Sequence, residues 1–185
     1  MADIGKLVVT GAAGHLGSQL IPQLLADGFD VTGVDMVEPS TTTGYRFVRA
    51  DLTARQDLEA AITGAQLIVH CAAIQPWKAY PDEQYLDANV KGIWQLYKAA
   101  AAQGINGIVM TSSIAAVGYA NITPAHWPLG ETFQTTTTDL YCLTKQTQEA
   151  IARQFAHLGL VRTLTLRPPA FMPSPAVGDW LQTAE

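Results

Sequence analysis

The stretch that decides the fold is Lys6-Leu7-Val8-Val9-Thr10-Gly11-Ala12-Ala13-Gly14-His15-Leu16-Gly17. Its first part, from Lys6 to Thr10, is short, apolar and rich in valine, which is typical of a buried strand. Leucines then recur at helical spacing from Gly14 to Ala26, until Gly28 ends the pattern. The sequence therefore predicts a strand that passes through a tight glycine turn directly into a helix.

Apolar strands and amphipathic helices alternate along the rest of the chain. We expect strands over residues 30–35, 45–49, 67–71, 107–111 and 160–167, helices over 57–62, 82–103 and 139–157, and a loop over 121–138. Continuously apolar strands separated by helices indicate a parallel sheet that is covered on both faces. With right-handed crossovers this gives an α/β fold with a doubly wound parallel sheet, as one domain over residues 1–185.

The composition argues against several classes of protein. The 185 residues are 48% hydrophobic and 15% charged, which suits a compact domain and not a disordered chain. A net charge of −5 without a basic cluster disfavours binding to nucleic acid. Apolar runs are too short to span a bilayer, and the first residues lack the features of a signal peptide. We therefore expect a cytoplasmic protein that binds neither membranes nor nucleic acid.

Cysteine and histidine give no sign of a metal site. The two cysteines, Cys71 and Cys142, are too few for a disulfide scaffold and do not have metal-ligand spacing. We expect both to be buried thiols. The four histidines are scattered along the chain, and none is assigned to a metal.

The glycine turn has the chemistry of a phosphate-binding loop. Glycines at Gly11, Gly14 and Gly17 allow a tight turn, close approach of backbone N–H groups to a pyrophosphate, and close packing of the helix. The positive end of the helix dipole adds to this attraction. The spacing is Gly-x-x-Gly-x-x-Gly, and an ordinary glycine-rich turn is the alternative. The predicted cofactor contacts here also include Ala13, His15 and Leu16.

Acidic residues after the second and third strands indicate where an adenosine would lie. Asp35 can accept hydrogen bonds from the ribose hydroxyls and would repel the extra phosphate of NADP. Met36 follows, where a basic residue would have suited NADP, so NAD is favoured. Asp51 and Leu52 could border the adenine, although Asp51 could equally be a helix N-cap. A surface aspartate that closes a strand is the alternative for Asp35.

Tyr141 and Lys145 lie four residues apart on the helix expected over 139–157, and therefore on one face of it. A free tyrosine has a pKa of about 10, too high for a base at neutral pH. A nearby ammonium group lowers that pKa, so the pair could exchange a proton with a substrate hydroxyl. A solvated helix face is the alternative explanation of this spacing.

Hydroxyl groups end the fifth expected strand, in the run Thr111-Ser112-Ser113. Ligands of open α/β sheets bind beyond the carboxyl ends of the strands, where a hydroxyl can bind a substrate oxygen. We assign this role to Ser113, with Ser112 as the second candidate. The alternative is that the serines simply end a strand.

The motifs together resemble the extended short-chain dehydrogenase/reductase family, the NAD-dependent epimerases and dehydratases. In chain order they are TGAAGHLG (10–17), Asp35, HCAA (70–73), Asn89, TSS (111–113), YCLTK (141–145) and LRPP (166–169). The resemblance covers nearly the whole chain. It implies an NAD-dependent enzyme that acts by hydride transfer on a sugar or nucleotide-sugar hydroxyl, most similar to uronate dehydrogenases.

The resemblance also implies roles for individual residues. Tyr141 would be the general acid/base, Lys145 would bind the nicotinamide ribose and tune the tyrosine, Ser113 would position the substrate, and Asn89 would support the lysine. Further residues would line the cofactor: Cys71, Ala72, Ala73, Thr111, Arg167 and Pro168. The helices over 82–103 and 139–157 would build a homodimer interface.

Two departures from the family pattern bear on function. Many members have a tyrosine where Val117 stands, whereas here Tyr119 follows, which changes the lining of the pocket. Members also continue well beyond the sixth strand, so the cofactor half is expected to be complete and the substrate region short or missing. A non-catalytic NAD sensor or interaction domain is therefore the rival interpretation.

Overall fold

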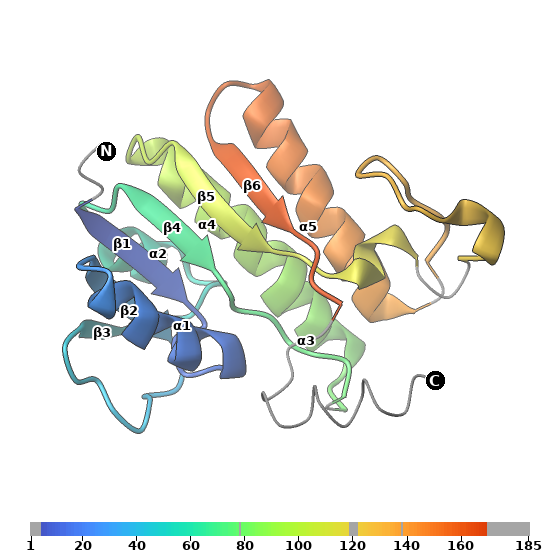
Figure 1. Cartoon of the computed structure of the whole chain (residues 1–185). Coiled ribbons are helices and arrows are strands. Elements are labelled where there is room, and N and C mark those ends of the chain that lie inside the picture. Colours follow the sequence, from blue (N-terminus) through green and yellow to red (C-terminus); the bar gives the residue numbers. More distant parts are fainter. Residues whose placement is uncertain (1–4, 78, 119–121, 138, 170–185) are drawn as a thin grey trace.

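A single parallel sheet organises the chain (Figure 1). The computed structural model describes residues 5–77, 79–118, 122–137 and 139–169. The strands are β1 (Lys6–Thr10), β2 (Asp30–Asp35), β3 (Arg46–Arg49), β4 (Leu67–His70), β5 (Gly107–Thr111) and β6 (Arg162–Leu166). All pairs are parallel, and the order is β3-β2-β1-β4-β5-β6. This is the doubly wound Rossmann order, and it confirms the predicted fold class.

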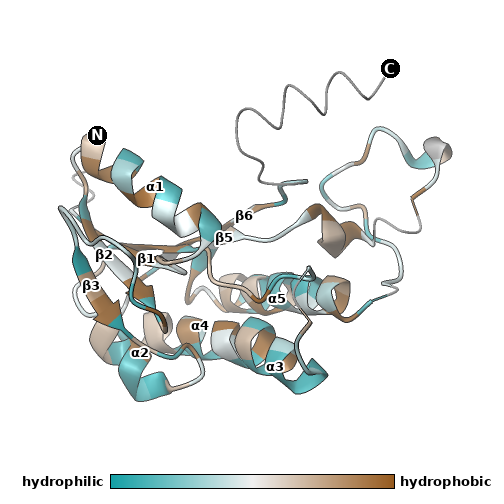
Figure 2. Ribbon diagram, turned by 90° about the horizontal axis from the view of Figure 1, so that it is seen from below, coloured by the Kyte–Doolittle hydropathy of each residue, from teal (hydrophilic) through white to brown (hydrophobic). Residues whose placement is uncertain are grey.

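Helices lie on both faces of the sheet (Figure 2). They are α1 (His15–Ala26), α2 (Arg55–Ala61), α3 (Asp82–Leu86), α4 (Gly92–Ala102) and α5 (Leu140–His157), with short 3-10 turns η2 (Ile114–Val117) and η4 (Pro124–His126). One apolar core lies between the sheet and α2, α4 and α5, and a smaller core lies under α1. Burial of these apolar side chains is the main term that holds the layers together. In the described part of the chain, no helix is long and apolar enough to cross a membrane.

One predicted helix is interrupted. The stretch expected as a continuous helix over 82–103 is α3, then a π-helical turn η1 (Asp87–Lys91), then α4. The spacing of apolar residues does not distinguish a π turn from α-helix, so the prediction of one regular helix was wrong. The expected loop over 121–138 likewise contains η4, and β6 is shorter than the strand expected over 160–167.

The carboxyl ends of the strands bring distant segments to one edge. The arrowheads in Figure 1 point the same way, so the turns after β1, β4 and β5 all leave from this edge. Connections run from β1 toward β2 and β3 on one side, and from β4 toward β5 and β6 on the other. The direction of the connections therefore reverses between β1 and β4. Ligands of such sheets bind beside this topological switch point, at the carboxyl ends of the two strands.

Candidate active site

The glycine turn leaves no room for side chains. Gly11 has a φ of +75°, and a Cβ there would lie 2.7 Å from the backbone nitrogen of Ala72. A Cβ on Gly17 would overlap the carbonyl oxygen of Gly11. The turn is closed by a hydrogen bond from the Gly14 N–H to that same carbonyl oxygen, at 3.0 Å. The structure thus gives a physical reason for Gly11 and Gly17, and a Cβ on Gly14 would lie 3.1 Å from the same oxygen. The turn leaves a backbone cradle at the start of α1.

Asp35 lies beside this turn. Its carboxylate accepts hydrogen bonds from the N–H groups of Ala13 and Val37, at 3.0 and 3.1 Å. Met36 is 57% exposed. Arg49, at the end of the neighbouring β3, donates from Nε to the Met36 carbonyl at 2.8 Å. Sequence reasoning missed Arg49, because only the pairing of β2 with β3 brings it here.

Asp51 and Leu52 follow β3. The alternative role of Asp51 as a helix N-cap was wrong, because the N-cap of α2 is Ala54. The Asp51 carboxylate instead accepts from the N–H of Thr53, at 2.8 Å, in a local turn. Leu52 is half-buried and packs against the larger core. Gly92 lies so close to it that a Cβ on this glycine would be 3.1 Å from the Cβ of Leu52.

The thiols next to the site are neutral. Cys142 is buried, as expected, whereas Cys71 after β4 is only half-buried. Burial raises the pKa of Cys71 to about 11, although a weak hydrogen bond from Thr111 Oγ1 acts to lower it. Burial and the carboxylate of Asp139 raise the pKa of Cys142 to about 12. Among the described residues, no cluster of histidine, cysteine and acidic side chains could hold a metal ion.

Tyr141 reaches the carboxyl edge of the sheet from the first turn of α5. Its phenol donates a hydrogen bond to Oε1 of Gln75, at 3.1 Å, and Gln75 lies on the segment that follows β4. Asp139 caps α5 by accepting from the Cys142 N–H at 2.8 Å, which fixes the start of the helix and the direction of the tyrosine.

Lys145 lies one turn further along α5 and is only 2% exposed. Its ammonium donates to the Thr111 carbonyl at the end of β5 and to Oε1 of Gln148, both at 3.1 Å. The same nitrogen is 5.8 Å from the centroid of the Tyr141 ring. Burial lowers the pKa of Lys145 to about 8, opposed by Glu149 and Cys71. The lysine is therefore mostly charged at neutral pH and favours the phenolate of Tyr141.

Asn89 connects two parts of the site from within η1. Its side chain accepts from the N–H of Ile74 at 2.8 Å and donates to the Ile74 carbonyl at 3.0 Å. Its own carbonyl accepts from Nε2 of Gln148 at 2.7 Å, and Gln148 in turn accepts from Lys145. Asn89 thus reaches the lysine through Gln148, a residue that sequence reasoning missed.

The two serines differ in their surroundings. Ser112 is buried, and its hydroxyl donates to Glu149 at 2.6 Å. Ser113 is half-buried, and its Oγ accepts from the N–H of Ala115 at 3.1 Å, which caps η2. A hydroxyl that accepts one bond can still donate its proton, so Ser113 is the better placed of the two to meet a substrate oxygen.

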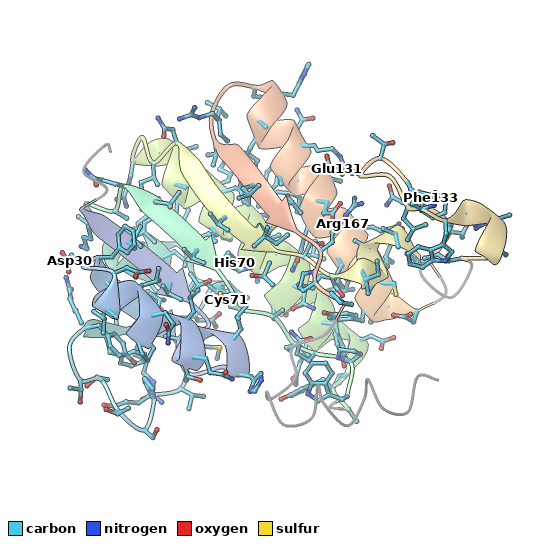
Figure 3. The ribbon with its side chains drawn as sticks, in the orientation of Figure 1. Asp30, His70, Cys71, Glu131, Phe133 and Arg167 are labelled. Carbon is cyan, nitrogen blue, oxygen red and sulfur yellow. The ribbon has the colours of Figure 1, made fainter. Side chains whose placement is uncertain are left out.

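Arg167 lies just after β6, near Glu131 (Figure 3). Its guanidinium binds the carboxylate of Glu149. The two nitrogens Nε and Nη2 lie 2.8 and 2.6 Å from the carboxylate, and Nη1 donates to the Glu131 carbonyl at 2.8 Å. The guanidinium therefore belongs to an ion pair, and the cofactor contact that the resemblance implied for Arg167 stays a prediction. Pro168 accepts from the Ile114 N–H at 3.1 Å and keeps this segment beside η2.

His70 is the remaining ionisable group at this end of the sheet. It is 1% exposed, and its Nδ1 lies 2.7 Å from Oγ1 of Thr10. Burial and the charge of Lys145 lower its pKa to about 3, so it is neutral. Within the described residues its Nε2 has no hydrogen-bond partner. Val117 is buried in η2, whereas Tyr119 lies outside the described residues.

Known proteins resemble this chain over the whole described fold. The model of the NAD dependent epimerase/dehydratase family matches residues 7–172. A UDP-glucose 4-epimerase from Mycolicibacterium smegmatis is 31% identical over 170 residues, which are 83% of this chain and 52% of that protein.

Solved structures give the same result. A short-chain dehydrogenase/reductase superfamily protein from Agrobacterium tumefaciens with bound NAD is 30% identical, with a TM-score of 0.78, over 88% of this chain and 48% of that one. Uronate dehydrogenase from the same organism is 30% identical, with a TM-score of 0.74, over 84% of this chain and 57% of that one. The chain thus spans about half the length of these relatives.

Proposed function

Since the chain belongs to the NAD dependent epimerase/dehydratase family, we propose that it binds NAD and oxidises a sugar-like hydroxyl. The observation that carries this proposal is the meeting of three segments at one edge of the sheet. The Tyr141 hydroxyl contacts the segment after β4, the Lys145 ammonium binds the end of β5, and the glycine turn lies after β1. A general acid/base, its tuning cation and a pyrophosphate cradle are what this reaction needs.

The residues at this edge fit NAD. The cradle of Gly11, Gly14 and Gly17, with Ala13, His15 and Leu16, would take the pyrophosphate at the N-terminus of α1. Asp35 would accept the ribose hydroxyls, because each of its oxygens receives one hydrogen bond and has room for another. The rest of the cofactor would be lined by Met36, Asp51, Leu52, Cys71, Ala72, Ala73, Thr111, Arg167 and Pro168. Bound NAD would supply the hydride acceptor.

The side chains of this chain would handle the proton. The phenolate of Tyr141 takes the proton of the substrate hydroxyl as the C–H bond breaks, and returns it in the reverse direction. The buried charge of Lys145 stabilises that phenolate and would hold the nicotinamide ribose. Ser113 would donate a hydrogen bond to the substrate oxygen, and Asn89 would support Lys145 through Gln148.

The similarity to a UDP-glucose 4-epimerase and to uronate dehydrogenase supports a sugar substrate. A panel of uronic acids, nucleotide sugars and simple secondary alcohols tests this directly. We expect at least one sugar to give reduction of NAD, measured by absorbance, or epimerisation. The simple alcohols should give neither. Silence across the panel, with NAD binding shown by calorimetry, would favour a non-catalytic NAD sensor.

We further propose that two copies associate through α3, α4 and α5. A mostly apolar hollow on this face is lined by Leu86, Val90, Trp94 and Ile151, together with the charged residues Asp87 and Lys91. Both Leu86 and Trp94 are 44% exposed. Exposed apolar surface of this kind favours association. Light scattering should give the mass of a dimer, and Leu86→Glu should give that of a monomer. Leu160→Glu, which changes a leucine that is 46% exposed outside this face, is the matched control. A monomeric wild-type chain at micromolar concentration would contradict the proposal.

A further inference from the structure

Gln75 is the side chain that contacts the reacting atom of Tyr141. Its Oε1 accepts the phenol hydrogen bond at 3.1 Å, although the two residues are 66 positions apart in the sequence. The segment that carries Gln75 leaves β4 at the carboxyl edge of the sheet. Family motifs and local spacing did not single out this glutamine.

The backbone around Gln75 is fixed from two elements. Tyr85 on α3 donates its hydroxyl proton to the Gln75 carbonyl at 3.1 Å. Asn89 on η1 holds both the N–H and the carbonyl of the preceding Ile74, at 2.8 and 3.0 Å. Asn89 is fully buried, so this clamp is protected from water. The backbone that carries the Gln75 side chain is therefore held in place beside Tyr141 by α3 and η1.

We infer that Gln75 is a positioning residue for Tyr141: its amide oxygen holds the phenol proton at Oη, and so sets the pH range in which this tyrosine can exchange a proton. The inference rests on the proposed function for its catalytic meaning. An acceptor oxygen stabilises the neutral phenol, whereas the Lys145 ammonium stabilises the phenolate. The amide at the hydroxyl and the ammonium near the ring act in opposite directions on the same ionisation, and the amide keeps the tyrosine protonated until a substrate hydroxyl takes its place.

The other ionisable groups on the elements that pack around this end of α5 are paired with a neighbour, exposed, or far along their element. On α5 itself, Asp139 accepts from Cys142. From η1, Asp87 and Lys91 form an exposed ion pair. On α3, the acidic Asp82 and Glu83 are exposed. The 3-10 turn η2 has no ionisable side chain, β6 has Arg162 at its far end, and α4 has Lys98. Lys145 contacts the Tyr141 ring and Gln75 contacts its hydroxyl.

The test follows the titration of Tyr141 itself. The chain has six tyrosines, which are labelled with carbon-13 at Cζ, and the signal of Tyr141 is assigned by its loss in Tyr141→Phe. Gln75→Glu places a negative charge at the acceptor and should raise the pKa of Tyr141 by about one unit or more. Gln75→Met removes the acceptor and should lower that pKa. Gln84→Glu makes the same change at an exposed position of α3 and should leave it unchanged.

In Gln75→Glu, the acid limb of the pH profile of kcat/KM for oxidation should shift to higher pH, together with the pKa of Tyr141. A merely structural role would lower activity at all pH values without moving this limb. An unchanged Tyr141 pKa in both Gln75 variants overturns the inference while the proposed function stands. A shifted pKa together with full turnover in Tyr141→Phe gives the opposite result: the contact is real, and the proposed function fails. If Gln75→Glu does not fold, Gln75→Met decides: a lowered Tyr141 pKa supports the inference, and a pKa that is not lowered overturns it.

Discussion

Replacing Glu149 by glutamine should lower the free energy of unfolding by about 2–4 kcal/mol, because it leaves a charged guanidinium without its partner in a largely dry site. The carboxylate is 3% exposed and receives Arg167 at 2.6 Å and Ser112 at 2.6 Å. Through these contacts it joins α5 to the ends of β5 and β6. Urea denaturation measures the change. Arg153→Ala is the matched control, since that side chain is 60% exposed and 3.5 Å from the same carboxylate, and it should cost less than about 1 kcal/mol.

The same pair predicts a dependence of stability on pH. Burial alone would raise the pKa of Glu149, but hydrogen bonds from Arg167 and Ser112 and the charges of Arg167 and Arg153 hold it below its ordinary value of 4.5. A carboxyl group whose pKa is lower in the folded state stabilises the fold above its unfolded pKa. This contribution is lost as the pH falls below that value. Wild-type protein should therefore lose more stability than Glu149→Gln on acidification, and parallel curves for the two would contradict this assignment.

The sheet could be predicted from the sequence because its signals are local. The first strand, Lys6–Thr10, and the fifth, Gly107–Thr111, have the predicted bounds, since each is a short apolar run that ends at polar or glycine residues. The glycine turn was predictable for the same reason. Its crowding involves neighbours within the motif, such as Gly11 and Gly17, as well as the backbone of Ala72.

The central part of the 82–103 stretch could not be predicted in detail. Apolar spacing assumes regular α-helical turns, whereas a π turn has i→i+5 hydrogen bonds and shifts the face that is buried. Tyr85 and Asn89 are therefore buried, while Leu86, which the spacing placed on the buried side, is 44% exposed. The consequence lies at Asn89, whose side chain holds Ile74 and whose carbonyl reaches Lys145 through Gln148. The sequence indicated that Asn89 supports the lysine, but not the intermediate residue.

The ion pair of Glu149 and Arg167 is a contact that the motifs did not predict. Arg167 follows β6, where the resemblance implied a cofactor contact, yet its guanidinium binds a carboxylate 18 positions away. One signal was present in the sequence: Glu149 lies four residues after Lys145, and therefore on the same face of α5. Gln75 carried no such signal, because only the fold brings it to Tyr141.

Tyr141→Phe removes a single oxygen and should lower kcat by about a thousandfold, in the range that loss of a general acid/base gives. NAD affinity should stay close to that of the wild-type chain, because the glycine cradle and Asp35 belong to the turn after β1 and to the end of β2, and not to α5. Tyr45→Phe is the matched control. Its hydroxyl donates to the Thr41 carbonyl on the exposed segment before β3, and its loss should leave turnover unchanged.

The most direct measurement combines both readouts on one preparation of Tyr141→Phe: the affinity for NAD by calorimetry, and kcat with a sugar substrate found in the panel. We expect wild-type binding of NAD with turnover reduced about a thousandfold. Turnover equal to that of the wild-type chain would show that the Tyr141 hydroxyl does not carry the proton, and would contradict the account.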